Sequence, residues 1–300
     1  MLRKLLILTC IALTLVKVNA QTPLDTVKHF VFGGFTSLTF NQVSLSNWVA
    51  GGEDALSATG ILNLFGKYKK EKIAWDNSLD LGYSFLKSGS QGVRKNEDKI
   101  EFNSILGYKA VEKLYYSVLL NYRSQFANGY KYPNDSVSLL VSRFNAPGYL
   151  ALSIGLDYKP NDFFSVYLSP IGARLTIVAD QALADSGAYG VDPAQKDAAN
   201  NIIKHGKQTR MEYGATLSAK FQKDVFKNVN VLSKLVLFNN YTDKHEDNRK
   251  NIDVNWEVMI NIKAGKYLTT SILANLIYDQ NIIAKTQFKE VLGVGVSYKF

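Results

Sequence analysis

The last ten residues, Val291–Phe300 (VLGVGVSYKF), point most directly to the fold, because their side chains alternate between two characters. Successive side chains of a β-strand lie on opposite faces of the sheet. One face would carry Leu292, Val294, Val296, Tyr298 and Phe300, and the other Val291, Gly293, Gly295, Ser297 and Lys299. This division suits lipid on one face and a barrel interior on the other. We therefore predict that the chain ends inside a strand of a membrane β-barrel.

Similar alternation recurs along the chain. In Lys72–Phe85 every odd position except Asn77 is apolar or aromatic, and the even positions are small or polar. Ile252–Lys263 shows the same alternation, and a helix would not place the apolar residues of this segment on one side. The pattern predicts twelve strands: 35–47, 55–68, 72–85, 98–109, 113–125, 149–158, 163–178, 209–222, 229–241, 252–263, 267–279 and 288–300.

The connections between these segments form two alternating sets. Short polar turns at 69–71, 110–112, 159–162, 223–227 and 264–266 alternate with long stretches at 86–97, 126–148, 179–208 and 242–251. Outer-membrane barrels have an even number of strands, short periplasmic turns and long extracellular loops. The predicted fold is thus all-β, a transmembrane antiparallel up-and-down β-barrel of about twelve strands. A soluble β-sandwich is the alternative fold. Within the predicted strand 163–178, Pro170 predicts a bulge.

The N-terminus has the features of a cleaved signal peptide. A basic start with Arg3 and Lys4 precedes an apolar run to Val16, and Val18 and Ala20 are small residues where a signal peptidase cuts. We expect a signal peptide at 1–20, a periplasmic segment at 21–34 and the barrel at 35–300. The single cysteine, Cys10, lies in the expected signal peptide, so disulfides and thiolate sites are excluded from the mature chain.

Charge and histidine content argue against several functions. The net charge of +9 falls to about +6 without residues 1–20, which gives no reason to invoke nucleic acid. His29, His205 and His245 all lie outside the predicted strands, where a general base could not reach a nucleophile at the lipid face. We expect no catalytic residues, no metal and no cofactor. An outer-membrane lipid hydrolase is a functional alternative that ranks behind the two non-enzymatic functions given below.

Two segments resemble known proteins. The C-terminal strand, with Tyr298 and Phe300, resembles the signal by which the outer-membrane barrel assembly machinery recognises its substrates. The segment with Asn47, Trp48, Gly51 and Gly52 is similar to the opening of an uncharacterised barrel family of Bacteroidota, domain of unknown function 3078. These resemblances imply a location in the outer membrane of a Gram-negative bacterium, with outer-membrane lipids and the assembly machinery as partners. The family implies no catalytic residues.

The inward face carries more functional information than any motif. Read strand by strand, it collects charged side chains of both signs in near balance: Asp76, Asp80, Lys99, Glu101, Arg123, Asp157, Arg174, Arg210, Glu212, Lys220, Lys234, Asp253 and Glu257. General ion channels more often have a lining of one sign. Balanced charges predict salt bridges across a narrow lumen. These residues either only satisfy one another or line a selective pore.

Two functions remain compatible with these features. The chain is either a narrow substrate-selective channel for a small polar solute, or a structural subunit of an envelope complex. The loop at 179–208 adds one expectation, because loops of this length are usually functional or disordered. Its stretch from Leu183 to Val191 contains apolar residues, so we predict that it folds back over the barrel mouth as a lid.

Overall fold

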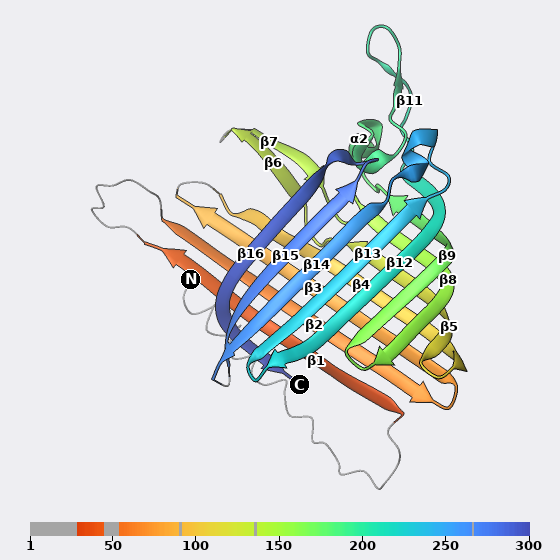
Figure 1. The fold of residues 1–300 in the computed structure, drawn as a ribbon. Coiled ribbons are helices and arrows are strands. Elements are labelled where there is room, and N and C mark those ends of the chain that lie inside the picture. Colours follow the sequence, from red (N-terminus) through yellow and green to blue (C-terminus); the bar gives the residue numbers. More distant parts are fainter. Residues whose placement is uncertain (1–28, 45–53, 90–91, 135–136, 266) are drawn as a thin grey trace.

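The computed structural model describes residues 29–44, 54–89, 92–134, 137–265 and 267–300. Twelve antiparallel strands form one closed barrel, in the ring order β1-β16-β15-β14-β13-β12-β9-β8-β5-β4-β3-β2 (Figure 1). The predicted all-β, up-and-down barrel is confirmed. The strands are β1 Phe30–Val43, β2 Ala55–Lys70, β3 Ile73–Ser88, β4 Arg94–Val111, β5 Leu114–Ser124, β8 Gly148–Asn161, β9 Phe164–Ile177, β12 Thr209–Phe226, β13 Val229–Asn240, β14 Asp253–Ala264, β15 Leu268–Asp279 and β16 Ile283–Lys299.

The first and last strands close the ring. Phe35 is in register with Lys299 and Thr39 with Gly295. β1 begins at Phe30, five residues before the expected start of the barrel, because Phe30–Gly34 also pair with β2. The predicted end of this strand, residues 45–47, lies outside the described residues. The start of β1 and the C-terminus lie at the same end of the barrel (Figure 1).

The two faces of the sheet differ as the alternation predicts. Trp75 and Trp256 are 44% and 45% exposed on the outer face, and the outward residues of β16 are also exposed. Inward polar groups such as Ser84, Asp157 and Glu212 are buried. Pro170 lies in a bulge of β9: the four residues from Ser169 to Gly172 match the three from Gly214 to Thr216 on β12, and the register with β8 shifts at the same place. The predicted bulge is therefore present.

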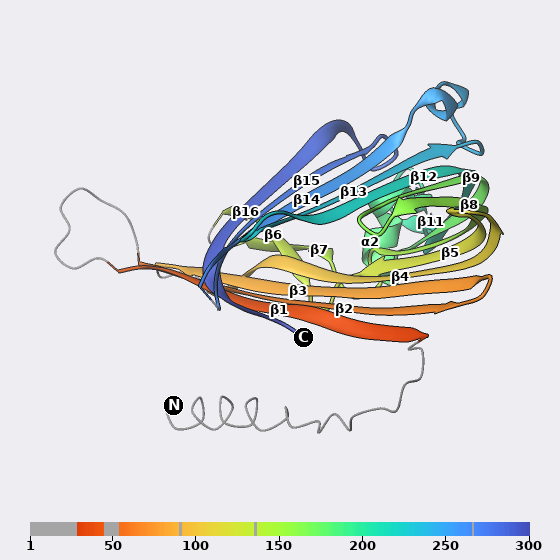
Figure 2. The same cartoon turned by 60° about the horizontal axis from the view of Figure 1, so that its bottom comes forward.

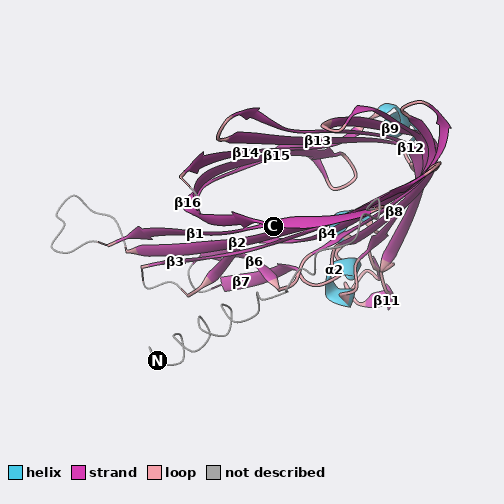
Figure 3. Cartoon of the chain, turned by 90° about the horizontal axis from the view of Figure 1, so that it is seen from below, coloured by secondary structure: helices cyan, strands magenta, loops and turns pink. Residues whose placement is uncertain are grey.

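The barrel is flattened in cross-section. Viewed from below, β13–β15 form one long side of the ring and β1–β4 the other (Figure 3). A second view shows the same two walls above one another (Figure 2). The described part of the chain contains no helix of the length and hydropathy needed to cross a bilayer.

The long connections contain structure that the alternation did not predict. The connection 126–148 holds a hairpin of β6 Gly129–Asn134 and β7 Val137–Ser142. The connection 179–208 holds α2 Gln181–Asp185, the 3-10 turn η1 Ala188–Gly190 and the short strands β10 Gln195–Lys196 and β11 Ile202–Lys204. A second 3-10 turn, η2 Glu246–Lys250, follows β13. α2 and β11 lie at the end of the barrel opposite to the C-terminus (Figure 1).

Candidate functional site

Strand register arranges the inward charges as two rows across the sheet. On one wall Asp80 pairs with Glu101, which pairs with Arg123, across β3, β4 and β5. On the other wall Lys220 pairs with Lys234, which pairs with Glu257, across β12, β13 and β14. Paired residues in an antiparallel sheet point to the same face. Each row is therefore a continuous charged belt that faces the lumen.

Salt bridges join these two rows through the interior. Lys234 Nζ lies 2.6 Å from Asp80 Oδ2, and Lys99 Nζ lies 2.7 Å from Glu257 Oε2. Lys99 also lies 3.0 Å from Glu101. β13 and β3 are diametrically opposite in the ring, as are β14 and β4. Side chains thus bridge the full width of the flattened lumen, as the balanced charges predicted.

A second charged cluster lies toward the end of the barrel that carries α2. Arg174 Nε donates to Glu212 Oε2 at 2.9 Å, and Arg174 Nη2 donates to Asp253 Oδ2 at 2.6 Å. Arg210 Nη2 lies 3.1 Å from the same Glu212 oxygen. Glu212 is only 2% exposed and also accepts a bond from Asn240. An almost buried carboxylate is thus compensated by two guanidinium groups, as buried charges require.

The remaining predicted residues lie on the same interior surface. Lys159 Nζ contacts Asp76 at 2.6 Å and Asp157 at 3.0 Å, close to the end of the barrel at which the C-terminus lies. The Arg123 guanidinium lies 4.9 Å from the centre of the Tyr149 ring. The structure therefore brings the charged candidates into one central belt and two flanking clusters.

Sequence reasoning missed several members of this network. Lys289 Nζ contacts Glu97 Oε2 at 2.6 Å, from β16 to β4. The alternation within 288–300 could have identified Lys289, because Lys289 lies two residues before Val291 and therefore points to the same inner face. Lys159 and Glu97 each lie one residue beyond a predicted strand end, so the underestimated strand lengths concealed them.

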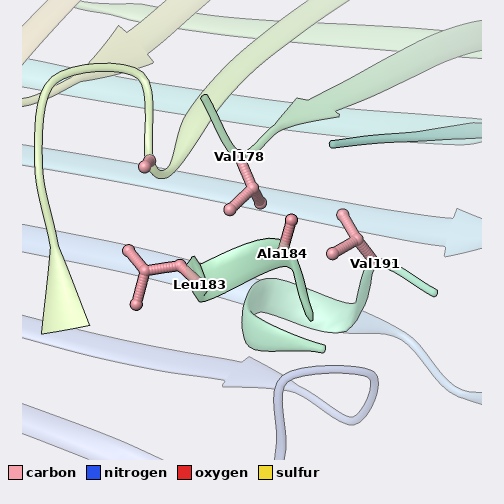
Figure 4. Packing of buried hydrophobic residues seen from close by; sticks show 5 residues of the cluster. Val178, Leu183, Ala184 and Val191 are labelled. Carbon is pink, nitrogen blue, oxygen red and sulfur yellow. The ribbon is translucent and has the colours of Figure 1, made fainter. Parts of the chain in front are cut away.

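The loop after β9 folds back as predicted and packs at the mouth. Leu183, Ala184 and Val191 form a buried apolar cluster with Val178 and Ala146, and Val178 and Ala184 face each other (Figure 4). A Cβ on Gly190 would come within 2.5 Å of Arg210 Nη1, so this part of the loop lies directly on the second charged cluster. We call residues 178–191 the lid segment.

Asp192, the residue directly after the lid segment, forms ion pairs that connect this loop to the neighbouring loop. Asp192 contacts Lys244 of the loop after β13, and it also contacts Lys207 at 3.0 Å. Hydrogen bonds from Lys244 and then Lys207 hold the pKa of Asp192 below its usual value. Within the lid segment, Asp180 caps α2 by accepting from the Leu183 backbone N–H, which lowers the pKa of Asp180.

The other predicted residues are placed as follows. Asn47, Trp48, Gly51 and Gly52 lie outside the described residues. Tyr298 and Phe300 are on the outer face with their rings stacked at 6.1 Å. His29 lies before β1, His205 Nδ1 is 2.9 Å from Asp185 on an exposed loop, and the His245 backbone N–H donates to Asp243.

Comparison with known proteins gives distant similarities. The translocator domain of the autotransporter NalP from Neisseria meningitidis is 11% identical, with 90% of this chain and 88% of that chain covered and a TM-score of 0.41. An outer membrane channel from Pseudomonas putida F1 is 13% identical, with 93% and 100% covered and a TM-score of 0.39. The outer membrane channel DcaP of Acinetobacter baumannii is 10% identical, with 90% and 97% covered and a TM-score of 0.30. No curated protein matches the sequence. Residues 40–130 match the model of a family described as "Protein of unknown function (DUF3078)".

Proposed function

We propose that this barrel is a narrow, non-enzymatic channel for a small polar solute in the outer membrane of a Gram-negative bacterium. The observation that supports this best is the pair of cross-lumen bridges, Lys234–Asp80 and Lys99–Glu257. They close the lumen with long side chains, and lysine side chains can move between rotamers without any change in the strands. A polar solute could replace one of these contacts with its own.

The outer surface supports the proposed location. Apolar and aromatic side chains on the lipid-facing side of β16 include Phe288, Leu292, Val294 and Val296, and all four are exposed. We propose outer-membrane lipids and the barrel assembly machinery as partners. The resemblance of the Asn47-Trp48 segment to a Bacteroidota family supports an origin in that group.

A structural subunit of an envelope complex is the second candidate. The interlocked lid segment and the bridged lumen favour it, because both stabilise one closed shape. A lipid hydrolase is less well supported, since the His205–Asp185 pair lies on an exposed loop rather than beside the lipid face.

Electrical recording from purified protein in planar bilayers tests the proposal. We expect small, selective conductance from the native barrel and larger conductance from Asp80→Asn/Glu257→Gln, in which both cross-lumen bridges lose their charge. Asp224→Asn is the matched control, because Asp224 bonds Asn230 at the end of β12, away from these bridges. Absence of conductance in all three proteins, together with a stoichiometric partner in a mild-detergent pull-down, would favour the structural subunit.

A further inference from the structure

Two lumen-facing lysines lack a partner of opposite charge. Lys220 is in register with Lys234, whose ammonium group is bound to Asp80. Lys67 on β2 is in register with Asp76, whose carboxylate is bound to Lys159. Within the described ranges, neither Lys220 nor Lys67 has an ion pair or a side-chain hydrogen bond. The nearby carboxylates are thus already occupied.

The two lysines come from opposite walls. β2 and β12 are diametrically opposite in the ring, like the strands that carry the central bridges. Lys220 is close enough to Lys234 and Lys67 for its charge to interact with both. Like charges directly opposite on neighbouring strands destabilise a sheet. The positive charge of Lys220 therefore lies where it does not stabilise the sheet.

The local charge count leads to the same conclusion. Lys220 and the charged groups that act on it, Lys234, Lys67, Asp80 and Asp76, carry three positive and two negative charges. One negative charge between Lys220 and Lys67 would balance the set. Lys220 is partly buried, whereas Lys67 is exposed. Partial removal of the Lys220 ammonium group from water without a counter-charge is costly, so a bound anion would stabilise this part of the barrel.

We propose that the periplasmic half of the lumen binds a small anion, such as an inorganic oxyanion or a carboxylate, between Lys220 and Lys67. The two ammonium groups would hold the anion by charge-assisted hydrogen bonds. This inference names the charge class of the solute and rests on the proposed channel. Solvation of both lysines by water alone is the competing outcome.

Two measurements distinguish failure of this inference from failure of the channel proposal. The first is the reversal potential of the full-length barrel in a potassium chloride gradient. We expect the native barrel to prefer anions, Lys220→Gln to lose that preference and Lys220→Arg to retain it. Lys223→Gln is the control, because Lys223 stacks over Phe163 at 4.3 Å beyond the lumen row and its substitution removes the same charge.

The second measurement is binding of inorganic phosphate to the detergent-solubilised barrel by calorimetry, which requires no conduction. We expect Lys220→Gln to weaken phosphate binding by about tenfold and Lys223→Gln to leave it unchanged. If no variant conducts but Lys220→Gln weakens phosphate binding, the anion site stands and the channel proposal fails. Cation preference in the native barrel, or equal phosphate binding by native protein and Lys220→Gln, would overturn the site.

Discussion

Phe300 and Gly34 close the barrel through a reciprocal pair of backbone hydrogen bonds. Gly34 N–H donates to Phe300 O at 2.9 Å, and Phe300 N–H donates to Gly34 O at 3.0 Å. A Cβ at position 34 would lie 2.6 Å from Phe300 Cζ. The terminal aromatic thus rests on a glycine that leaves room for its ring, so the residue proposed as an assembly signal also forms the seam.

The first prediction follows from this seam. Gly34→Leu should prevent closure, because the new side chain would occupy the position of the Phe300 ring, and deletion of Phe300 should act similarly. Gly60→Leu is the matched control, because a Cβ at Gly60 meets nothing within 4 Å. The readouts are outer-membrane level and heat-modifiable gel mobility. Normal mobility of Gly34→Leu would show that the seam tolerates a side chain there.

A second prediction concerns the energy of a cross-lumen bridge. Glu257→Gln removes the charge that holds Lys99 from the opposite wall, although Lys99 keeps Glu101 at 3.0 Å. We expect a loss of about 1.5–3 kcal/mol in the free energy of unfolding, typical of a hydrogen bond to a charged group. Denaturant titration in a double-mutant cycle with Lys99→Gln measures the coupling.

A surface ion pair provides the comparison for that cycle. Glu246 lies 3.4 Å from Arg249 and is 86% exposed, so Glu246→Gln should cost less than about 0.5 kcal/mol. Equal costs at Glu257 and Glu246 would mean that the lumen is as well solvated as the surface.

The third prediction concerns the orientation of β14. Val258 is in register with Ser233 and Ala274 on the lipid face, whereas Asn255 is in register with Val236 and Ile277 on the inner face. Val258→Arg should cost about 2–4 kcal/mol if it lies near the bilayer midplane. Asn255→Arg should cost less, although it loses a bond from Asn275. Unfolding from lipid vesicles measures both, and a larger penalty at Asn255 would reverse the assignment of faces.

The fourth prediction concerns the lid segment. Ala188 is partly buried against the apolar cluster, and Lys196 is exposed. A cysteine at Ala188 should therefore react slowly with a membrane-impermeant thiol reagent on whole cells, and one at Lys196 should react fast. Deletion of 183–191 should raise conductance. Equal labelling with unchanged conductance would reduce the loop to a tether.

The fifth prediction is the pH dependence of the loop contact at Asp192. The pKa of this carboxyl is lowered in the folded protein by Lys244 and Lys207. The contact is therefore fully present above the ordinary aspartate pKa of about 3.9 and is lost as the pH falls through the lower folded value. Labelling of the Ala188 cysteine should rise only in strongly acidic buffer.

The matched variant removes this titration. Asp192→Asn should raise labelling at neutral pH and make it insensitive to acid. If labelling of the Ala188→Cys protein with Asp192 intact instead rises between pH 5 and 7, a group other than Asp192 controls the lid segment.

The sequence predicted the barrel well because an apolar outer face and a polar inner face impose a period of two on the strands. The outward phase of Trp75 and Trp256 and the bulge at Pro170 follow from local pattern alone. The inward charges could be identified for the same reason, but their partners could not. The contact of Lys234 with Asp80 depends on the flattening of the ring, which no local pattern encodes. The β6–β7 hairpin was missed because β6, which is polar and contains Pro133, resembles a loop.

The diametric bridges have a consequence for how such a barrel could evolve. Gain or loss of a β-hairpin is a simple genetic change that would convert twelve strands into ten or fourteen. In either ring β13 would no longer stand across from β3, nor β14 from β4, and both cross-lumen bridges would be lost together. The charge pattern of the interior therefore disfavours changes in strand number. A change in the number of strands would require substitutions of the charged interior residues at the same time.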